Sequence, residues 1–231
     1  MKFLPCCACD RRRSSRRSAA LLPPPLLLLL LLPRAAAAPL PAADSSGEAE
    51  LEEPAARRAP LPASLGLARL LRARAAELQL ELCNKFTVCE NSMEMLMQND
   101  LNLPQVTEDD GCLLDGFNED KCLRKISSGL YTFRTYLEYV KETFTSEKQH
   151  VDSLCNSTER LAHIIRQMVI NPDEVIIPDS ATQESLHKKL KSNKKWIEKI
   201  TIHLILRDFT SFMEKTMRAV RYLKHTRSFS V

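Results

Sequence analysis

Residues 112–137 read CLLDGFNEDKCLRKISSGLYTFRTYL, and this stretch decides the fold class. Two cysteines enclose nine residues, and the segment from the second one onward is apolar at positions 123, 126, 130, 133, 137, 140 and 144. Alternating steps of three and four keep one face of a helix buried. The stretch therefore predicts a short oxidised loop that leads into a long amphipathic helix.

Further helices are predicted on both sides of this stretch, and strand-like alternation is nearly absent. The helix after the loop spans about 119–144, with Asn118 as a good N-cap. Three other long segments repeat the helical period, at about 64–88, about 147–170 and about 193–224. A short extra helix is expected from Ser180 to Leu190, because Ser180 and Gln183 stand at capping-box spacing.

The lengths of the connections predict how the four long helices are arranged. About 30 residues separate the first helix from the second, and about 22 separate the third from the fourth, so both links can cross the length of a bundle. Only a few residues join the second helix to the third, which makes these two antiparallel neighbours. The expected fold is all-α, a long-chain four-helix bundle with up-up-down-down topology and two long crossover loops.

The ends of the chain predict a secreted protein. Residues 1–38 combine a basic stretch, a leucine run and a small-residue region, the pattern of a signal peptide, with the cut expected after a residue between Ala37 and Ala43. Residues 39–62 are rich in Pro, Ala, Glu and Ser with almost no large apolar side chains, and they are expected to form a flexible arm. The domain is placed at 63–224 and a tail at 225–231. No later stretch is long and uncharged enough to stop transfer, so no membrane insertion is expected.

The charge of the predicted mature chain argues against nucleic-acid binding. Residues 1–38 hold seven of the 33 Lys and Arg residues and one of the 29 Asp and Glu residues. Removing them leaves 26 basic against 28 acidic residues, since 33 − 7 = 26 and 29 − 1 = 28. A nearly neutral chain lacks the concentrated basic footprint of nucleic-acid-binding proteins.

Five cysteines remain after the signal peptide is removed. Four of them allow three pairings, and the simplest joins nearest partners, Cys83 with Cys89 and Cys112 with Cys122. Cys155 is left over near the apolar face of its helix, where it is either a buried inert thiol or an intermolecular partner. A zinc site is not expected, because the pairs lack the two-to-four-residue spacing of zinc knuckles.

Catalytic signatures are missing, so the chain is not expected to be an enzyme or to need a cofactor. Two Glu-x-x-His sequences, Glu147 to His150 and Glu184 to His187, are of the kind used by di-iron bundles. A di-iron site would also need inward carboxylates on the other two helices, and the apolar stripe of 119–144 has none. The lone histidines, His163 and His203 among them, are interpreted as ordinary helix residues.

The quoted stretch resembles the interleukin-6 family, whose signature has this cysteine spacing followed by Gly-Leu-x-x-Phe/Tyr. The resemblance runs from Cys83 to Leu223, and it includes both disulfide spacings and the blocks at 99–104 and 203–207. The divergent arm and the tail beyond Leu223 indicate a non-mammalian member. The resemblance implies a cytokine that joins a specific alpha receptor to a shared signal-transducing chain, in immune and acute-phase responses.

The resemblance implies a first surface that binds the alpha receptor. Its residues match Leu113, Phe117, Arg218 and Arg221, although leucine at 113 replaces an aromatic residue of the family. Without the resemblance, the two arginines would be interpreted as a solvated face that complements the helix C-terminus. The basic strip of Arg218 and Arg221 is extended by Lys215, Lys224 and Arg227, which suggests acidic glycans as a further partner.

Two more surfaces are implied for the signal-transducing chain. The second consists of Leu70, Arg74, Ser157 and Arg160 on the first and third helices. The third, which meets a second copy of that chain, consists of Leu96 and Trp196.

Two features bear on these surfaces. Asn156-Ser157-Thr158 is an N-glycosylation acceptor beside the second surface, so either the sequon is unused or that surface is shifted. Trp196 on sequence alone would be a partly buried core residue. Trp is nevertheless a residue type that dominates binding hot spots.

The sequence thus predicts a secreted helical cytokine that assembles receptors and performs no chemistry. Another long-chain cytokine of the same fold is the alternative within signalling. A metal-binding or small-ligand-binding bundle is the alternative from another class.

Overall fold

The structure is a computed structural model that describes residues 60–86, 89 and 101–229. The predicted signal peptide, residues 39–59 of the predicted arm, and Leu96 lie outside the described residues. The described chain forms helices and loops without a strand. Its α-helices are α1 (Pro60–Phe86), α3 (Glu119–Thr143), α4 (Lys148–Arg166), α5 (Ser180–Leu190) and α6 (Lys195–Phe229). Three short 3-10 turns lie between them, at Glu108–Asp110, Thr145–Glu147 and Pro172–Glu174.

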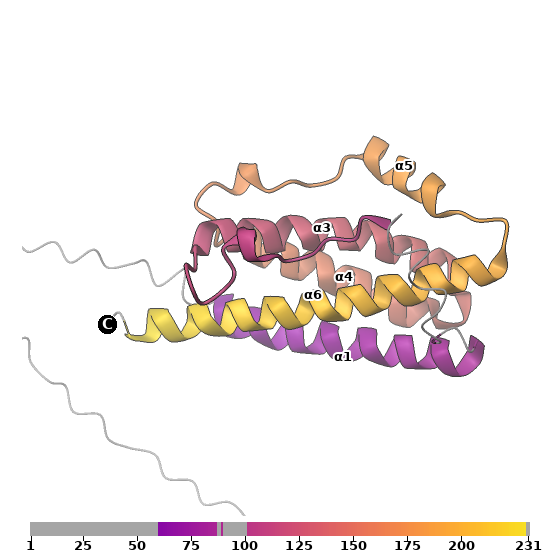
Figure 1. Cartoon of the computed structure of the whole chain (residues 1–231), viewed down its shortest axis with the longest axis horizontal. Coiled ribbons are helices and arrows are strands. Elements are labelled where there is room, and N and C mark those ends of the chain that lie inside the picture. Colours follow the sequence, from indigo (N-terminus) through magenta and orange to yellow (C-terminus); the bar gives the residue numbers. More distant parts are fainter. Residues whose placement is uncertain (1–59, 87–88, 90–100, 230–231) are drawn as a thin grey trace, which may run out of the picture. The chain divides into compact units, whose positions relative to one another are not determined.

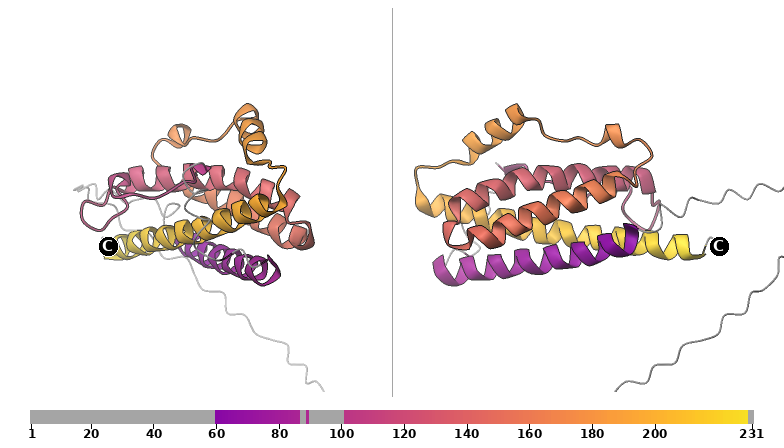
Figure 2. Two further views of the ribbon diagram at one scale, coloured as in Figure 1. Left: turned by 45° about the vertical axis from the view of Figure 1, so that its right-hand side comes forward. Right: turned by 180° about the vertical axis from the view of Figure 1, so that it is seen from behind.

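The four long helices form the predicted bundle. In Figure 1, α1 and α3 run in one direction, and α4 and α6 run in the other, which is the up-up-down-down arrangement. The helix α1 packs on α6 and α4, and α3 packs on α4 and α6. The link from α4 to α6 crosses over α3 and carries α5, which lies on the outer side of α3 (Figure 2).

Aromatic rings of α3 and α6 fill the middle of the core. The Phe133 ring lies 5.2 Å from the rings of both Phe209 and Phe212, in tilted or edge-on contacts that suit aromatic quadrupoles. Gly129, one turn before Phe133, lets these helices approach closely, because a Cβ there would lie 2.5 Å from the Phe212 ring. The glycine of the quoted stretch therefore has a packing role.

Two helix ends differ from the predicted boundaries. The helix α1 begins at Pro60, inside the residues assigned to the arm, and Leu61 is buried. Proline suits the first helical turn, because its missing N–H has no partner there. The helix α6 continues to Phe229, through most of the residues assigned to a tail.

Other helix ends refine the predictions. Asn118 caps α3 as predicted, and its Oδ1 accepts a hydrogen bond from the Lys121 N–H at 3.0 Å. The cap of α5 is Asp179 and not Ser180, since the Asp179 carboxylate accepts from the Thr182 N–H at 2.8 Å. The helix α4 ends at Arg166, four residues earlier than predicted.

The cysteines pair with their nearest partners. Disulfides join Cys83 to Cys89 and Cys112 to Cys122, with Cα atoms 5.6 Å and 4.9 Å apart. Cys155 is free and fully buried, and burial raises the pKa of its thiol to about 12. None of the helices in the described part of the chain is both long and apolar enough to cross a membrane.

Candidate receptor-binding surfaces

The loop before α3 is held in shape by local contacts. Besides the Cys112–Cys122 disulfide, the Asn118 N–H donates to the Gly111 carbonyl at 2.9 Å. Gly111 and Gly116 have φ of 70° and 79°, a region that glycine adopts without steric cost. These contacts leave Leu113 on the outside, 47% exposed. The loop is therefore a fixed platform.

This loop also packs against the C-terminal part of α6. The Phe117 ring lies 4.7 Å from the Tyr222 ring, tilted by 57°. A second link joins Arg227 of α6 to the Glu119 carboxylate at the start of α3. Both links tie the predicted first surface together from segments about 100 residues apart in sequence.

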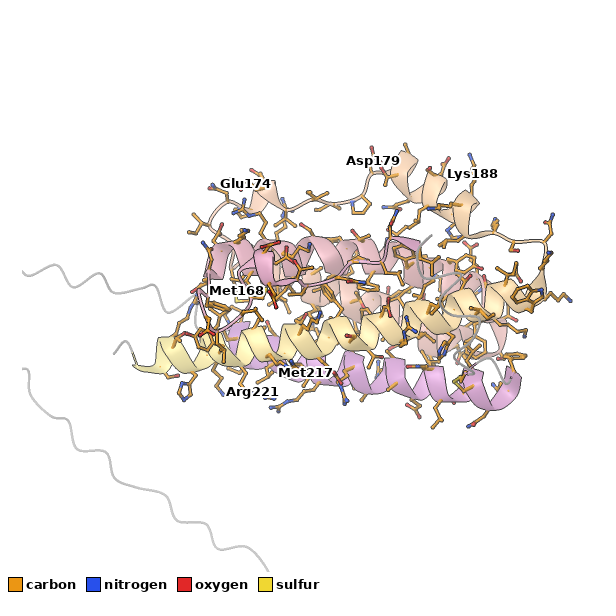
Figure 3. The ribbon with its side chains drawn as sticks, viewed as in Figure 1. Met168, Glu174, Asp179, Lys188, Met217 and Arg221 are labelled. Atoms are coloured by element: carbon orange, nitrogen blue, oxygen red, sulfur yellow. A yellow bond between two sulfur atoms is a disulfide. The ribbon has the colours of Figure 1, made fainter. Side chains whose placement is uncertain are left out.

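Arg218 and Arg221 stand exposed on α6 beside this loop. They are three positions apart and therefore lie on the same side of the helix. Tyr222, whose ring makes the tilted contact with Phe117, directly follows Arg221. Neither arginine forms an ion pair with another described residue, so both guanidinium groups are available to a partner. Figure 3 labels Arg221 on the C-terminal part of α6.

The basic strip is shorter than predicted. Arg227 is buried against Glu119, so it does not belong to an exposed strip. Lys215 is exposed, but its ammonium donates to the Val106 carbonyl at 2.7 Å. Lys224 is exposed next to the two arginines. The strip is thus centred on Arg218, Arg221 and Lys224.

The predicted second surface lies where α1 meets α4. The Arg74 guanidinium donates to the Ser153 hydroxyl at 2.7 Å, which sets the register between these antiparallel helices. Leu70 lies one turn before Arg74 in α1, and Ser157 lies one turn after Ser153 in α4. Because the helices are antiparallel, this register places Leu70 opposite Ser157. Leu70 is 42% exposed and Ser157 is half-buried.

Arg160 and Asn156 stand exposed on α4 beside the second surface. Neither side chain is buried by the bundle. The Asn156 amide donates to Asp152 within α4 at 3.3 Å. Asn156 therefore faces solvent next to the second surface, whereas Thr158 of the same sequon is fully buried, and use of the sequon stays a prediction.

The predicted third surface is described at one of its two residues. Trp196 opens α6 and is 46% exposed, so it is not a core residue. Leu96 lies outside the described residues. Around Trp196, Lys194 and Lys195 are exposed as well. A large half-exposed aromatic side chain among cations is the kind of anchor that protein interfaces use.

The Glu-x-x-His sequences do not build a metal centre. His150 pairs with Glu147 at 3.0 Å, at the exposed start of α4. His187 pairs with Glu142 of α3 at 2.7 Å, whereas Glu184 is exposed on α5. Each histidine therefore pairs with a different glutamate near the surface, and neither Glu-x-x-His sequence supplies the inward carboxylates of a di-iron bundle.

One group of possible metal ligands occurs in the described part of the chain. It consists of Cys83, Cys89 and His203. The His203 Nδ1 lies 3.8 Å and 3.6 Å from the two sulfur atoms. Because those sulfur atoms are joined in a disulfide, neither is a thiolate ligand.

Sequence reasoning missed the residues that position the first surface. Tyr222 stands four positions after Arg218, and the helical period places it on the side that meets the loop, so this signal was present in the sequence. The pairing of Glu119 with Arg227 joins residues 108 positions apart and had no local signal.

Four long helices in up-up-down-down order, joined by two long connections, are the architecture of a long-chain helical cytokine. Residues 41–223 match the Interleukin-6/G-CSF/MGF family. The chain belongs to this family, which is one of cytokines and not of enzymes.

The relatives agree with this membership. Interleukin-6 of Gallus gallus is 71% identical over 195 residues, 84% of this chain and 81% of the relative. Interleukin-6 of Saimiri sciureus is 42% identical over 146 residues, 63% of this chain and 69% of the relative. The higher identity to the bird protein agrees with a non-mammalian member. A solved structure described as a cytokine/receptor complex shares the fold, with a TM-score of 0.62 and 21% identity over 70% of this chain and 96% of that chain.

Proposed function

We propose that this cytokine is secreted, binds the interleukin-6 alpha receptor through Leu113, Phe117, Arg218 and Arg221, and then recruits the shared signal-transducing chain. The second surface receives one copy of that chain and the third surface receives another. Bringing the receptor tails together triggers intracellular kinase signalling in immune and acute-phase responses.

The observation that carries the proposal is the pair of exposed arginines beside a fixed apolar platform. Arg218 and Arg221 have no ion-pair partner among the described residues, and the loop with Leu113 and Phe117 is fastened to α6 beside them. Planar guanidinium groups bind carboxylates bidentately and pack on aromatic rings. Such a surface is preorganised, so little ordering entropy is lost when a partner binds.

The test is binding to the immobilised alpha-receptor ectodomain of the same species. The secreted chain is compared with Arg218→Glu/Arg221→Glu and with the control Lys188→Glu/Lys191→Glu. The control reverses two exposed charges at α5, and Figure 3 places Lys188 on the opposite side of the bundle from Arg221. We expect the first variant to lose at least about a hundredfold in affinity, and the control to bind like the parent. A correctly disulfide-bonded parent that fails to bind would contradict the proposal.

A separate variant tests the second surface. Arg74→Glu/Arg160→Glu alters the α1–α4 face and leaves α6 unchanged. We expect this variant to keep its affinity for the alpha receptor and to lose recruitment of the signal-transducing chain. Equal loss of both activities, with an unchanged melting temperature, would show that the two surfaces are not independent.

A further inference from the structure

A pocket of about 300 Å³ opens at the end of the bundle where α6 begins. Its apolar wall comes from Leu82 and Phe86 of α1, Phe144 after α3, and Ile202 of α6. Its charged lining consists of Lys195 and Lys199, one turn apart on α6, and of Glu198 between them. We call this feature the bundle-end pocket. Apolar walls with a few charged groups at the mouth are typical of sites that orient a side chain or small ligand.

The aromatic wall is built from two segments that pack on each other. The rings of Phe86 and Phe144 are 6.4 Å apart and meet edge to face. Lys85 links the same segments, because its ammonium pairs with Glu147 at 2.6 Å. The side chain of Lys85 is thus occupied, and it also lies 5.5 Å from the Phe144 ring. The wall is therefore a fixed part of the fold.

The two lysines at the mouth lack an anionic partner. Neither Lys195 nor Lys199 forms an ion pair with any residue that the structure describes. The Lys199 ammonium lies 2.8 Å from the centroid of the Phe86 ring. The ring therefore shields one side of the ammonium group from water. Ammonium groups are strongly hydrated, and a partly desolvated one gains most from an incoming carboxylate.

The electrostatic balance at the mouth is positive. Burial lowers the pKa of Lys199, and the neighbouring Lys195 lowers it further. Glu198 opposes this change, but its contribution is the smallest of the three. Lys195, Lys199 and Glu198 leave the lining with one more positive than negative charge, since 2 − 1 = +1, and this excess favours an anion over a cation.

The pocket adjoins Trp196. Lys195, which lines the pocket, directly precedes Trp196 on α6, and Trp196 is half-exposed without lining the pocket itself. A partner that covers both Trp196 and Lys195 would also cover part of the pocket mouth. Covering the mouth would exclude water from the Lys199 ammonium, which already lies over the Phe86 ring, and would strengthen any ion pair formed there.

We infer that the bundle-end pocket binds a carboxylate side chain, flanked by an apolar residue, from the second copy of the signal-transducing chain. The inference rests on the proposed function and names the chemistry of the partner at the third surface. The apolar residue lies against Phe86 and Phe144, and the carboxylate pairs with Lys195 and Lys199.

The experiment uses the secreted chain with both disulfides intact. The variant Lys195→Met/Lys199→Met removes both charges and keeps the aliphatic stems. Its matched control, Lys188→Met/Lys191→Met, removes two exposed charges at the C-terminal end of α5. Each protein is bound to the alpha-receptor ectodomain and titrated with the signal-transducer ectodomain. The mass of each complex is measured in solution. It shows whether one or two copies of the signal-transducer ectodomain have bound.

The expected result is specific to one step. The pocket variant binds the alpha receptor and the first copy like the parent, and its affinity for the second copy falls about tenfold. The control matches the parent in all three steps. Recruitment of the second copy by the pocket variant at parental affinity would overturn the inference and leave the proposed function standing. Failure of the parent to bind the alpha receptor would overturn both.

Salt dependence and ligand analysis complete the test. Raising NaCl from about 0.05 M to about 0.5 M should weaken second-copy recruitment by the parent more than by the pocket variant, because salt screens the ion pair. An identical salt response would overturn the inference. So would a fatty acid or similar small carboxylate found in the purified chain by native mass spectrometry and lost in the pocket variant, since the pocket would then be a lipid site.

Discussion

The two ends of the bundle present contact residues in different ways. At the end where α3 begins and α6 finishes, Phe117 is stacked on Tyr222 and the loop is closed by the Cys112–Cys122 disulfide. At the other end, Trp196 projects half-exposed beside a pocket whose lysines have no described anionic partner. The first end joins its contact residues into one surface, whereas the second presents an exposed anchor beside a pocket that a partner must fill.

This difference fits the order of assembly that we propose. A preassembled surface loses little entropy on binding and suits the first, specific receptor contact. An anchor with an open pocket gains most from a partner that is already held nearby by other contacts. Substitutions at each end of the bundle, and in the regions that belong to neither end, test this difference.

The largest effect is expected at Cys155, in the interior that both ends share. Burial raises the pKa of its thiol from 9.0 to about 12, so at pH 8 the folded chain holds about a thousandfold less thiolate than the unfolded chain. Alkylation of Cys155 in the native protein, followed by mass spectrometry without reductant, should be slower than in the unfolded chain by at least about that factor, because the reagent also cannot reach the buried thiol.

The same pKa change gives a direction for stability. The unfolded thiol loses its proton above about pH 9, and the folded thiol keeps it up to about pH 12. A raised folded-state pKa stabilises the protein below the unfolded value, and this contribution is lost as pH rises between the two values. Cys155→Ala should remove this part of the alkaline slope in denaturant unfolding. Fast native alkylation at pH 8 would show that α4 opens easily.

The next largest effect separates the two disulfides. Removing either one should lower the free energy of unfolding by roughly 2–3 kcal/mol, because both close short loops. Only Cys112→Ala/Cys122→Ala should also weaken alpha-receptor binding, by at least about tenfold, since it releases the platform of the first surface. Denaturant titration and receptor binding measure the two quantities. Cys83→Ala/Cys89→Ala is the matched control, and equal binding losses for the two variants would erase the distinction between the ends.

A smaller effect is expected from the aromatic contact at the first surface. Tyr222→Leu keeps apolar volume but loses the stack on Phe117, which is worth about 0.5–1.5 kcal/mol. We expect alpha-receptor affinity to fall about three- to tenfold, with unchanged recruitment at the other end. Tyr131→Leu, a change of the same type on α3, serves as the control. If Tyr222→Leu binds like the parent, the stack does not position Phe117.

The smallest effect is expected at α5, which belongs to neither end. The Asp179 carboxylate caps this helix, and its hydrogen bond with Thr182 lowers its pKa below the usual range. A lowered pKa stabilises the cap above the unfolded value, and this contribution is lost as pH falls through the folded value. Asp179→Ala should speed hydrogen exchange in Ser180–Leu190 at neutral pH and change no receptor affinity. Unchanged exchange would show that packing alone holds α5.

Local patterns in the sequence were sufficient to predict the helices and their order. The apolar stripe after Cys122, the Asn118 cap and the short link between α3 and α4 are all encoded by neighbouring residues. The boundaries failed where distant contacts extend a helix. The helix α6 continues to Phe229. There Arg227 pairs with Glu119, which lies 108 positions away, so no local sequence pattern could predict the contact.

The candidate surfaces were predictable to a similar extent. A residue such as Trp196 could be named from the resemblance, and its exposure agrees with a role as an anchor. The bundle-end pocket could not be foreseen, because Phe86, Phe144 and Lys199 come from three segments that only the fold brings together. Likewise, the sequence predicted Arg227 to be part of an exposed basic strip, but the fold buries its side chain.

The most direct test of the central claim uses one aromatic reporter at each end. Hydroxyl-radical footprinting of the secreted chain, with and without the alpha-receptor ectodomain, measures the oxidation of Tyr222 and Trp196 side by side. We predict that the receptor protects Tyr222 together with Leu113 and leaves Trp196 as reactive as in the free chain. Protection of Trp196 with unchanged Tyr222 and Leu113 would contradict the assignment of the first surface to the end where the loop meets α6.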